Sequence, residues 1–153
     1  SFKHNILVAN LVHHMTSQLA GRPYFAIPND LKVRVPDGRY YYPDIVVVPE
    51  SPEFEDERTD IVLNPLVVFE VLSPSTRAID RGENLDAYRP IPPLTDYVLV
   101  AQDRRSIDHY AKGDDGTWRL TIAEEAAATI VLPSIDCTLP LADVYAKLDL
   151  AAD

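Results

Sequence analysis

Two short apolar runs constrain the fold of this chain more than any other feature. Residues 45–48 read IVVV and residues 66–71 read LVVFEV, and both are rich in β-branched residues. Runs of this kind place apolar side chains on both faces of a strand, which is typical of central strands covered on both sides. We therefore expect the two segments to be neighbouring strands near the middle of one sheet.

Apolar spacing along the rest of the chain predicts the elements around these strands. Apolar residues at three- and four-residue spacing over residues 3–20 predict an amphipathic helix. The stretch LKVRV, residues 31–35, alternates apolar with basic residues and should form a hairpin with residues 40–48 across the turn PDGR. The further predicted elements are a polar helix over 78–88, a strand at 96–101 reached by a right-handed parallel crossover, an antiparallel meander through SIDHY and TWRLT, and a C-terminal helix in LPLADVYAKL. This order predicts an α/β (α+β) sheet domain.

The composition bounds the class of protein. With 153 residues, 46% of them hydrophobic, the chain can bury one core, and we expect one domain over residues 1–153. Cys137 is the single cysteine, so no internal disulfide can form, and no stretch approaches the roughly 20 apolar residues that span a bilayer. We expect no membrane partner and a reducing, cytoplasmic setting. Because a helical pattern is already under way at the first residues, we also expect part of the N-terminal segment to be missing.

The formal net charge of −10 restricts how the chain could meet nucleic acid. It argues against a protein that coats nucleic acid through bulk electrostatics, because phosphate binding draws on clustered Lys and Arg. It does not argue against a metal enzyme, since cation sites are built from carboxylates and a bound divalent ion changes the charge that a phosphate meets.

Two carboxylates interrupt the apolar runs. Asp44 stands at the start of the first run, and alternation along the second places Glu70 on one face with Val68 and Leu72. A carboxylate among apolar residues is costly unless it is paired, hydrogen-bonded or bound to a cation. One Mg²⁺ between Asp44 and Glu70 would satisfy both, and phosphodiester hydrolysis is the chemistry suited to that ion. The residues alone leave open the alternative that both acids are structural, with Asp44 hydrogen-bonded to nearby backbone at the start of its strand.

The stretches YYYPDIVVV, PLVVFEVLSPST with the following DRGE, and LPLADVY resemble the Uma-two family of endonucleases, within the PD-(D/E)XK restriction-endonuclease-like superfamily. The resemblance covers nearly the whole chain, and it matches the family's proline and aspartate to Pro43 and Asp44 and its glutamate to Glu70. It implies Mg²⁺-dependent cleavage of DNA, with Mn²⁺ as a substitute, by an enzyme whose metal ligands are Asp44 and Glu70. It also implies a restriction-endonuclease-like fold, with a mixed central β-sheet flanked by helices, and a homodimer, because cutting two strands needs two sites.

The chain departs from that family pattern at the lysine. In the superfamily a lysine follows the glutamate by two residues, where this chain has Leu72, and relatives with a DRGEK stretch carry a lysine where this chain has Asn84. Arg81, Lys32 and Arg77 are the cations that could take its place, judged by nearness along the chain. An arginine stays protonated and can clamp a phosphate, but it is a poor general base.

Three functions therefore stay open. The first is the metal-dependent endonuclease. The second is a catalytically weak or inactive nuclease-fold relative that acts as a binding or assembly module, which the replacement of the lysine by Asn84 would favour. The third is a small hydrolase that uses the same acids as general acid and base without a metal. A serine hydrolase is unsupported, because the chain has no G-x-S-x-G motif, and its 5 glycines form no phosphate-binding loop.

Overall fold

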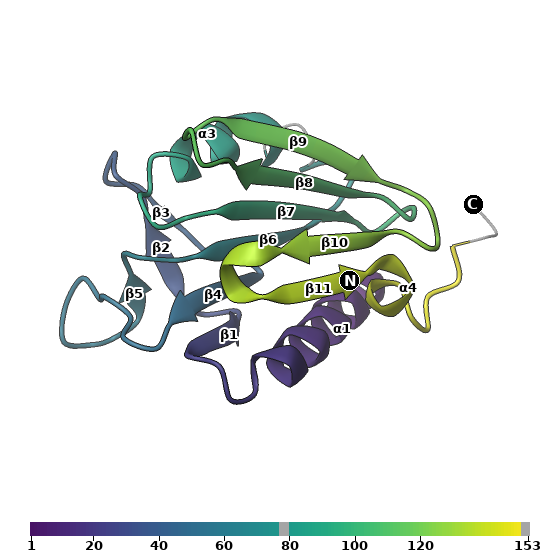
Figure 1. The fold of residues 1–153 in the computed structure, drawn as a ribbon, viewed down its shortest axis with the longest axis horizontal. Helices are drawn as coiled ribbons and strands as arrows, with labels where there is room; N and C mark the ends of the chain where they lie inside the picture. The colour runs from purple at the N-terminus through teal and green to yellow at the C-terminus, as the bar shows by residue number, and fades with distance from the viewer. Residues whose placement is uncertain (77–79, 151–153) are drawn as a thin grey trace.

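The two apolar runs form neighbouring strands of one sheet. In the computed structural model, which describes residues 1–76 and 80–150, they become β4 (Ile45–Pro49) and β6 (Val67–Leu72), paired antiparallel (Figure 1). The sheet has six strands in the order β1-β4-β6-β7-β8-β9. Its other strands are β1 (Tyr24–Pro28), β7 (Asp96–Ala101), β8 (Ile107–Lys112) and β9 (Trp118–Ala123). Because β6 and β7 run parallel while the other neighbours run antiparallel, the sheet is mixed, and the predicted parallel pair and meander are confirmed.

Burial on both faces explains the central place of β6 and β7. All residues of β7 are buried, and Glu70 is the one residue of β6 that is only half-buried. Phe69 and Val71 contribute to the first of two cores, whereas Val68 and Leu72 contribute to the second. The predicted alternation along this strand is therefore confirmed, with Glu70 on the face of the second core.

The first core lies between the sheet and α1 (Phe2–Leu19). The helix buries apolar residues at three- and four-residue spacing, as predicted, and they are Leu7, Val8, Leu11, Met15 and Leu19. A hairpin and a short helix close the same core beside α1 (Figure 1), and they are β10 (Thr129–Leu132), β11 (Cys137–Pro140) and α4 (Leu141–Val144). The thiol of Cys137 is buried in it.

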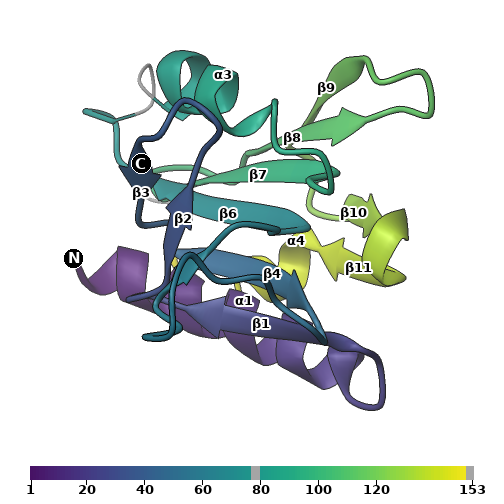
Figure 2. The same ribbon diagram turned by 90° about the vertical axis from the view of Figure 1, so that its left-hand side faces the viewer.

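The second core covers the opposite face of the sheet, so that α1 and α3 lie on opposite sides (Figure 2). Its cover consists of a small sheet in the order β3-β2-β5 and a helical segment. These elements are β2 (Lys32–Arg34), β3 (Tyr40–Tyr41), β5 (Ile61–Val62), the π-helical turn η1 (Asp80–Asn84) and α3 (Leu85–Tyr88). Contacts between Tyr41, Tyr88, Tyr97 and Tyr110, with ring centroids 5.2, 5.2 and 6.3 Å apart in that order, join β3 and α3 to the large sheet. Tilted pairs at these distances add to the energy of apolar burial.

The predicted hairpin of residues 31–35 with 40–48 is only partly correct. β2 and β3 do pair antiparallel, but the chain leaves the small sheet at Pro43, and β4 joins the large sheet. Proline has no N–H group and a fixed φ, so it does not continue a hydrogen-bonded ladder. β1, which pairs with β4, was not predicted.

The helix predictions after β6 are also modified. Helical turns cover Asp80–Asn84 and Leu85–Tyr88, as expected, whereas residues 77–79, including the candidate Arg77, lie outside the described residues. The C-terminal helix begins later than predicted, at Leu141, because the preceding residues pair as β11.

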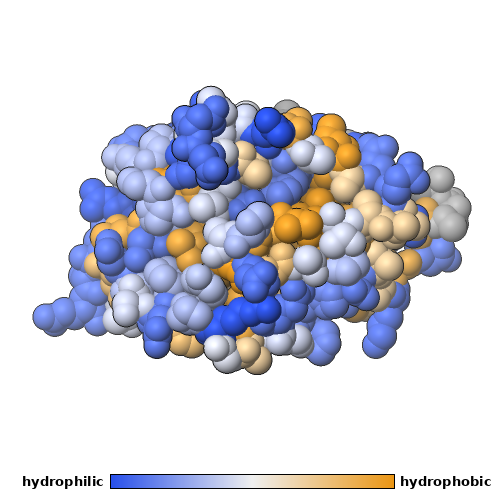
Figure 3. Space-filling model, in the orientation of Figure 1, coloured by the Kyte–Doolittle hydropathy of each residue, from blue (hydrophilic) through white to orange (hydrophobic). Residues whose placement is uncertain are grey.

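The surface seen in Figure 3 is mainly hydrophilic, with patches of hydrophobic residues between the hydrophilic areas. Among the exposed large side chains, Tyr40 and Tyr42 lie together beside Lys32. Within residues 1–76 and 80–150, no helix combines the length and the apolar character needed to cross a membrane.

Tyr145, which follows α4, ties the C-terminal segment to the end of the large sheet. Its hydroxyl lies 2.8 Å from the carbonyl oxygen of Ala101 and 2.9 Å from that of Ser106, and it accepts the N–H of Ser106 at 3.1 Å. Burial raises the pKa of Tyr145 from 10.0 to about 12. The protonated phenol is therefore the form that the folded protein favours.

We predict that Tyr145→Phe lowers the free energy of unfolding by about 1–3 kcal/mol, because the buried N–H of Ser106 loses its acceptor. In the unsubstituted protein the contribution of this phenol is fully present below pH 10.0 and is lost as the pH rises toward about 12. Urea unfolding at neutral and alkaline pH measures both effects. Tyr42→Phe, at a side chain that is 61% exposed, is the control and should change stability by less than about 0.5 kcal/mol. An unchanged urea midpoint for Tyr145→Phe would contradict the prediction.

Candidate active site

Asp44 extends the hydrogen-bonded ladder between β4 and β6. The last paired residues are Ile45 and Phe69, so the next position along β6 is Glu70. Asp44 stands at the corresponding position before β4, and its Oδ2 accepts the N–H of Val71 at 2.7 Å. Asp44 therefore makes the backbone hydrogen bond that was considered for a carboxylate at the start of this strand. The bond also places that carboxylate against β6, beside the position of Glu70.

His4, in the first turn of α1, contacts the other oxygen of the same carboxylate. Its Nε2 lies 3.0 Å from Asp44 Oδ1, and the two side chains are 27% and 18% exposed. Asp44 is thus held between α1 and β6 while keeping some access to solvent. Sequence reasoning did not place His4 in the site, because a single histidine near a helix start is more often structural, and nothing local reveals its contact with a residue so far along the chain.

The donor set for a metal ion at this point is small. In the part of the chain that the structure describes, no group of three or more His, Cys, Asp or Glu side chains could hold a metal ion. An ionised carboxylate has about four lone-pair positions, so Asp44 retains acceptor capacity beyond its two contacts. Two carboxylates with further positions left for water and phosphate suit Mg²⁺, and they do not suit a closed structural Zn²⁺ site.

Glu70 belongs to a row of side chains that crosses the sheet. Glu70 on β6 is in register with Leu99 on β7, and Leu99 is in register with Asp108 on β8. We call these three residues the cross-strand row. Since paired residues share a face, the row lies on the side of the second core, beneath the helical segment η1–α3. It therefore places a second acid, Asp108, on the same face as Glu70.

Arg81, from η1, reaches down to this row. Its Nη2 lies 2.5 Å from Oδ2 of Asp108, whose side chain is only 3% exposed. No donor among the described residues meets that oxygen with hydrogen-bond geometry, so the contact is an ion pair rather than an aligned hydrogen bond. A buried carboxylate of this kind holds a cation firmly, because leaving it alone in the interior would be costly.

Asp108 was also missed by sequence reasoning, although a signal for it exists. In SIDHY, the acid alternates with Ile107 and His109, as Glu70 alternates with valine and phenylalanine in β6. The same argument from an acid inside a strand applies to both positions.

The other candidate cations lie elsewhere. The Nζ atom of Lys32 is 5.2 Å from the ring centroid of Tyr42 and 5.8 Å from that of Tyr40. A hydrogen bond to Tyr42 raises the pKa of Lys32. Leu72 is buried in the second core, and Asn84 is the half-buried last residue of η1. The structure thus joins Arg81 to the cross-strand row and Lys32 to the tyrosines.

We predict that Arg81→Gln lowers the free energy of unfolding by about 1–3 kcal/mol, because Asp108 is left buried without its counter-charge. Adding Asp108→Asn should recover part of this loss, and urea unfolding of the four members of a double-mutant cycle measures the coupling. Arg89→Gln is the control, since Arg89 pairs with the exposed Asp86 at the surface and should change stability by less than about 1 kcal/mol. Strictly additive effects of the two substitutions would show that the pair is not coupled.

Comparison with known proteins finds matches over most of the chain. A family model described as "Putative restriction endonuclease" (Uma2) matches residues 1–142. The uncharacterized protein sll1609 of Synechocystis sp. is 34% identical over 122 residues, which are 79% of this chain and 69% of that protein. The uncharacterized protein slr1290 of the same organism is 32% identical over 149 residues, covering 97% of this chain and 77% of that protein.

One solved structure shows the same fold. The crystal structure of "a putative nuclease belonging to DUF820" from Anabaena variabilis superimposes with a TM-score of 0.72, covering 94% of this chain and 80% of that chain at 20% identity. The predicted restriction-endonuclease-like fold, a mixed central sheet flanked by helices, is thereby confirmed.

Proposed function

The chain belongs to the Uma2 family, and from that premise we propose that it is an endonuclease that hydrolyses phosphodiester bonds of DNA in a reaction dependent on Mg²⁺. The observation that carries this proposal is the carboxylate of Asp44 bonded to β6 at Val71, next to Glu70. Two carboxylates supply the hard oxygen ligands that Mg²⁺ prefers, and sites of this kind leave positions for waters and phosphate oxygens. Mn²⁺ should substitute, since it accepts the same ligands.

When bound, Mg²⁺ would supply a Lewis acid that polarises the scissile phosphate. The residues of the chain orient its ligands. The N–H of Val71 and the ring of His4 hold Asp44 in one orientation, and the pairing of β6 with β7 fixes the backbone position of Glu70. Hydrogen-bonded partners of this kind orient metal ligands.

In this proposal Arg81 supplies the positive charge that the family lysine supplies elsewhere. It lies on the face of the cross-strand row and is held by Asp108, whereas the two positions at which a lysine was expected are Leu72 and Asn84. A guanidinium can stabilise charge on a phosphate but does not serve as a general base. Its role is therefore positioning and charge stabilisation, not proton abstraction.

We predict that Asp44→Asn and Glu70→Gln each reduce Mg²⁺-dependent cleavage of DNA by at least roughly 10²-fold, since each removes a charged oxygen ligand. Both should also weaken Mn²⁺ binding measured by calorimetry. Asp114→Asn, in the exposed turn between β8 and β9, is the control and should change neither quantity. Undiminished cleavage by Asp44→Asn would rule out the assigned metal site.

A further prediction tests the cation. Arg81→Gln should lower cleavage by about 10²- to 10³-fold, the usual effect of removing one preorganised charged donor. Adding Asn84→Lys to that variant should restore part of the rate, because it returns a cation to the family position. Arg89→Gln, an exposed arginine outside the row, should leave the rate unchanged. If Arg81→Gln cuts as fast as the unsubstituted protein, Arg81 has no part in the reaction.

A second candidate function is a binding or assembly module that keeps the fold and has lost turnover. The observation that favours it is the absence of a lysine at both Leu72 and Asn84. The binding-module assignment is correct if the unsubstituted protein and the Asn84→Lys variant both bind Mn²⁺ and neither cuts any DNA. The homodimer and the cytoplasmic setting stay predictions.

A further inference from the structure

The hairpin of β2 and β3 presents two tyrosines and two cations on its outer face. Arg34 is in register with Tyr40, and two residues further along the hairpin Lys32 contacts Tyr42. The intervening Val33 is buried beneath. Tyr40 and Tyr42 are 46% and 61% exposed. We call Lys32, Arg34, Tyr40 and Tyr42 the aromatic ribbon.

Within the ribbon the cations lie against the ring faces. The Nζ of Lys32 lies 5.8 and 5.2 Å from the centroids of Tyr40 and Tyr42, and the Cζ of Arg34 lies 6.0 Å from that of Tyr40. Exposed rings interleaved with Lys and Arg form the kind of surface that binds single-stranded nucleic acid, where bases stack on the rings and phosphates meet the cations.

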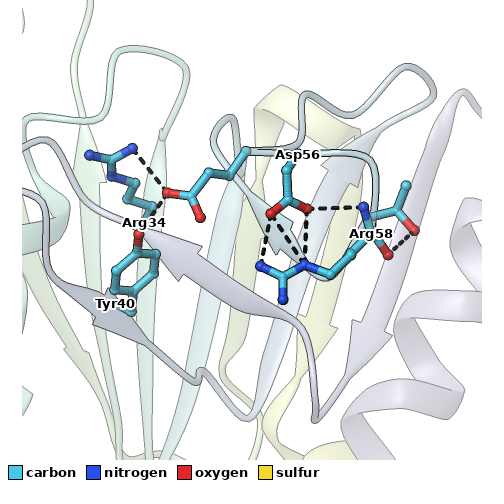
Figure 4. A network of polar contacts seen from close by, with 6 residues as sticks. Arg34, Tyr40, Asp56 and Arg58 are labelled. Atoms are coloured by element: carbon cyan, nitrogen blue, oxygen red, sulfur yellow. Dashed lines mark hydrogen bonds and ion pairs between the residues drawn. The ribbon is translucent and has the colours of Figure 1, made fainter.

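An acidic side chain already occupies one phosphate-like position on the ribbon. Glu55 accepts hydrogen bonds from Arg34 Nη1 at 3.0 Å and from the hydroxyl of Tyr40 at 2.6 Å (Figure 4). The bond to Glu55 also raises the pKa of Tyr40. The same loop contains a separate ion pair, in which Nη2 of Arg58 lies 2.9 Å from Oδ2 of Asp56. A carboxylate held by a guanidinium and a hydroxyl marks where an anionic oxygen of a ligand would bind.

We propose that the aromatic ribbon binds unpaired nucleotides of the nucleic acid, with bases stacked on Tyr40 and Tyr42, phosphates at Lys32 and Arg34, and Glu55 as a competitor that the ligand displaces. The inference rests on the proposed function, because it names the substrate class of that same site. Tyr42 is two residues before Asp44, so their backbones lie within about 7 Å. A nucleic-acid strand bound on the ribbon would therefore lie next to the carboxylates of the proposed metal site.

Unpaired nucleotides fit this surface better than a duplex does. In a duplex the ring faces of the bases are stacked on one another, whereas a single strand offers them to aromatic side chains. The net charge of −10 also disfavours binding driven by phosphate contacts alone. With two cations engaged, the logarithm of the binding constant should fall against the logarithm of salt concentration with a slope of only about −1.4.

The test is fluorescence anisotropy with a labelled oligothymidylate and with a labelled duplex, both in EDTA so that no cleavage occurs. The single strand should bind more tightly than the duplex. Tyr42→Leu should weaken single-strand binding by about 5- to 150-fold, Tyr42→Phe should largely retain it, and Glu55→Gln should strengthen it. Phe25→Leu is the matched control, an aromatic residue on β1 that is 50% exposed and outside the ribbon, and it should have no effect.

Three outcomes would overturn the inference. They are equal or tighter binding of the duplex, unchanged binding by Tyr42→Leu, and no single-strand binding by either the unsubstituted chain or Glu55→Gln. If Tyr42→Leu instead changes the oligomeric state in light scattering and leaves oligonucleotide binding alone, the ribbon is a protein interface and the inference is wrong.

The same variants separate this inference from the proposed nuclease activity. Asp44→Asn should abolish Mg²⁺-dependent cleavage and leave single-strand binding in EDTA intact. Tyr42→Leu should raise KM for a single-stranded substrate with little change in kcat. If Asp44→Asn still cuts while Tyr42→Leu loses the oligonucleotide, the nuclease site is wrong and the ribbon stands. If cleavage depends on Asp44 while Tyr42→Leu binds normally, the nuclease stands and the ribbon is wrong.

Discussion

Burial of β6 and β7 on both faces is the constraint on which the rest of the structure depends. Two layers of cover are required, and the chain provides them from its ends and its middle. α1, the β10–β11 hairpin and α4 cover one face, while the small sheet and η1–α3 cover the other. The apolar area removed from water by these layers is the main driving force for the arrangement. Charged side chains are accommodated in such a sheet where a strand ends or where a group of opposite charge or a hydrogen-bonding group lies beside them.

Two acids near the candidate site, Asp44 and Asp108, follow that rule. Asp44 stands immediately before β4, and its carboxylate accepts a hydrogen bond from a backbone N–H of β6. Asp108 is buried, and its carboxylate forms an ion pair with Arg81. Each acid is thus part of the packing as well as a candidate for chemistry. A ligand at Asp44 would have to bind through its remaining lone pairs, without breaking the contacts to Val71 and His4 that keep the strand end in place.

The sequence predicts the parts of the fold that local periodicity encodes. Apolar runs locate β4 and β6, alternation assigns the face of Glu70, and three- and four-residue spacing locates α1. Non-local pairings are not encoded in this way. β1 is a short edge strand that pairs with β4 after β2 and β3 have intervened, so no nearby turn reveals its partner. The ion pair of Arg81 from η1 with Asp108 from β8 is also non-local, so no local pattern in the sequence predicts it. The break at Pro43 is readable in principle, because proline ends a ladder, but its consequence for sheet membership depends on the other strands.

The buried thiol of Cys137 has a consequence for how the motions of this protein can be followed. Cys137 is the single cysteine in the sequence, it opens β11, and burial raises its pKa. A thiol reacts as the thiolate, so this one should be nearly inert to alkylating reagents in the closed structure. Modification then requires the C-terminal hairpin to separate from the core, and its rate under native conditions counts those openings. The rate of alkylation of Cys137 therefore measures the local unfolding of one defined segment. Because the sequence contains no second cysteine, the measured rate comes from this thiol alone.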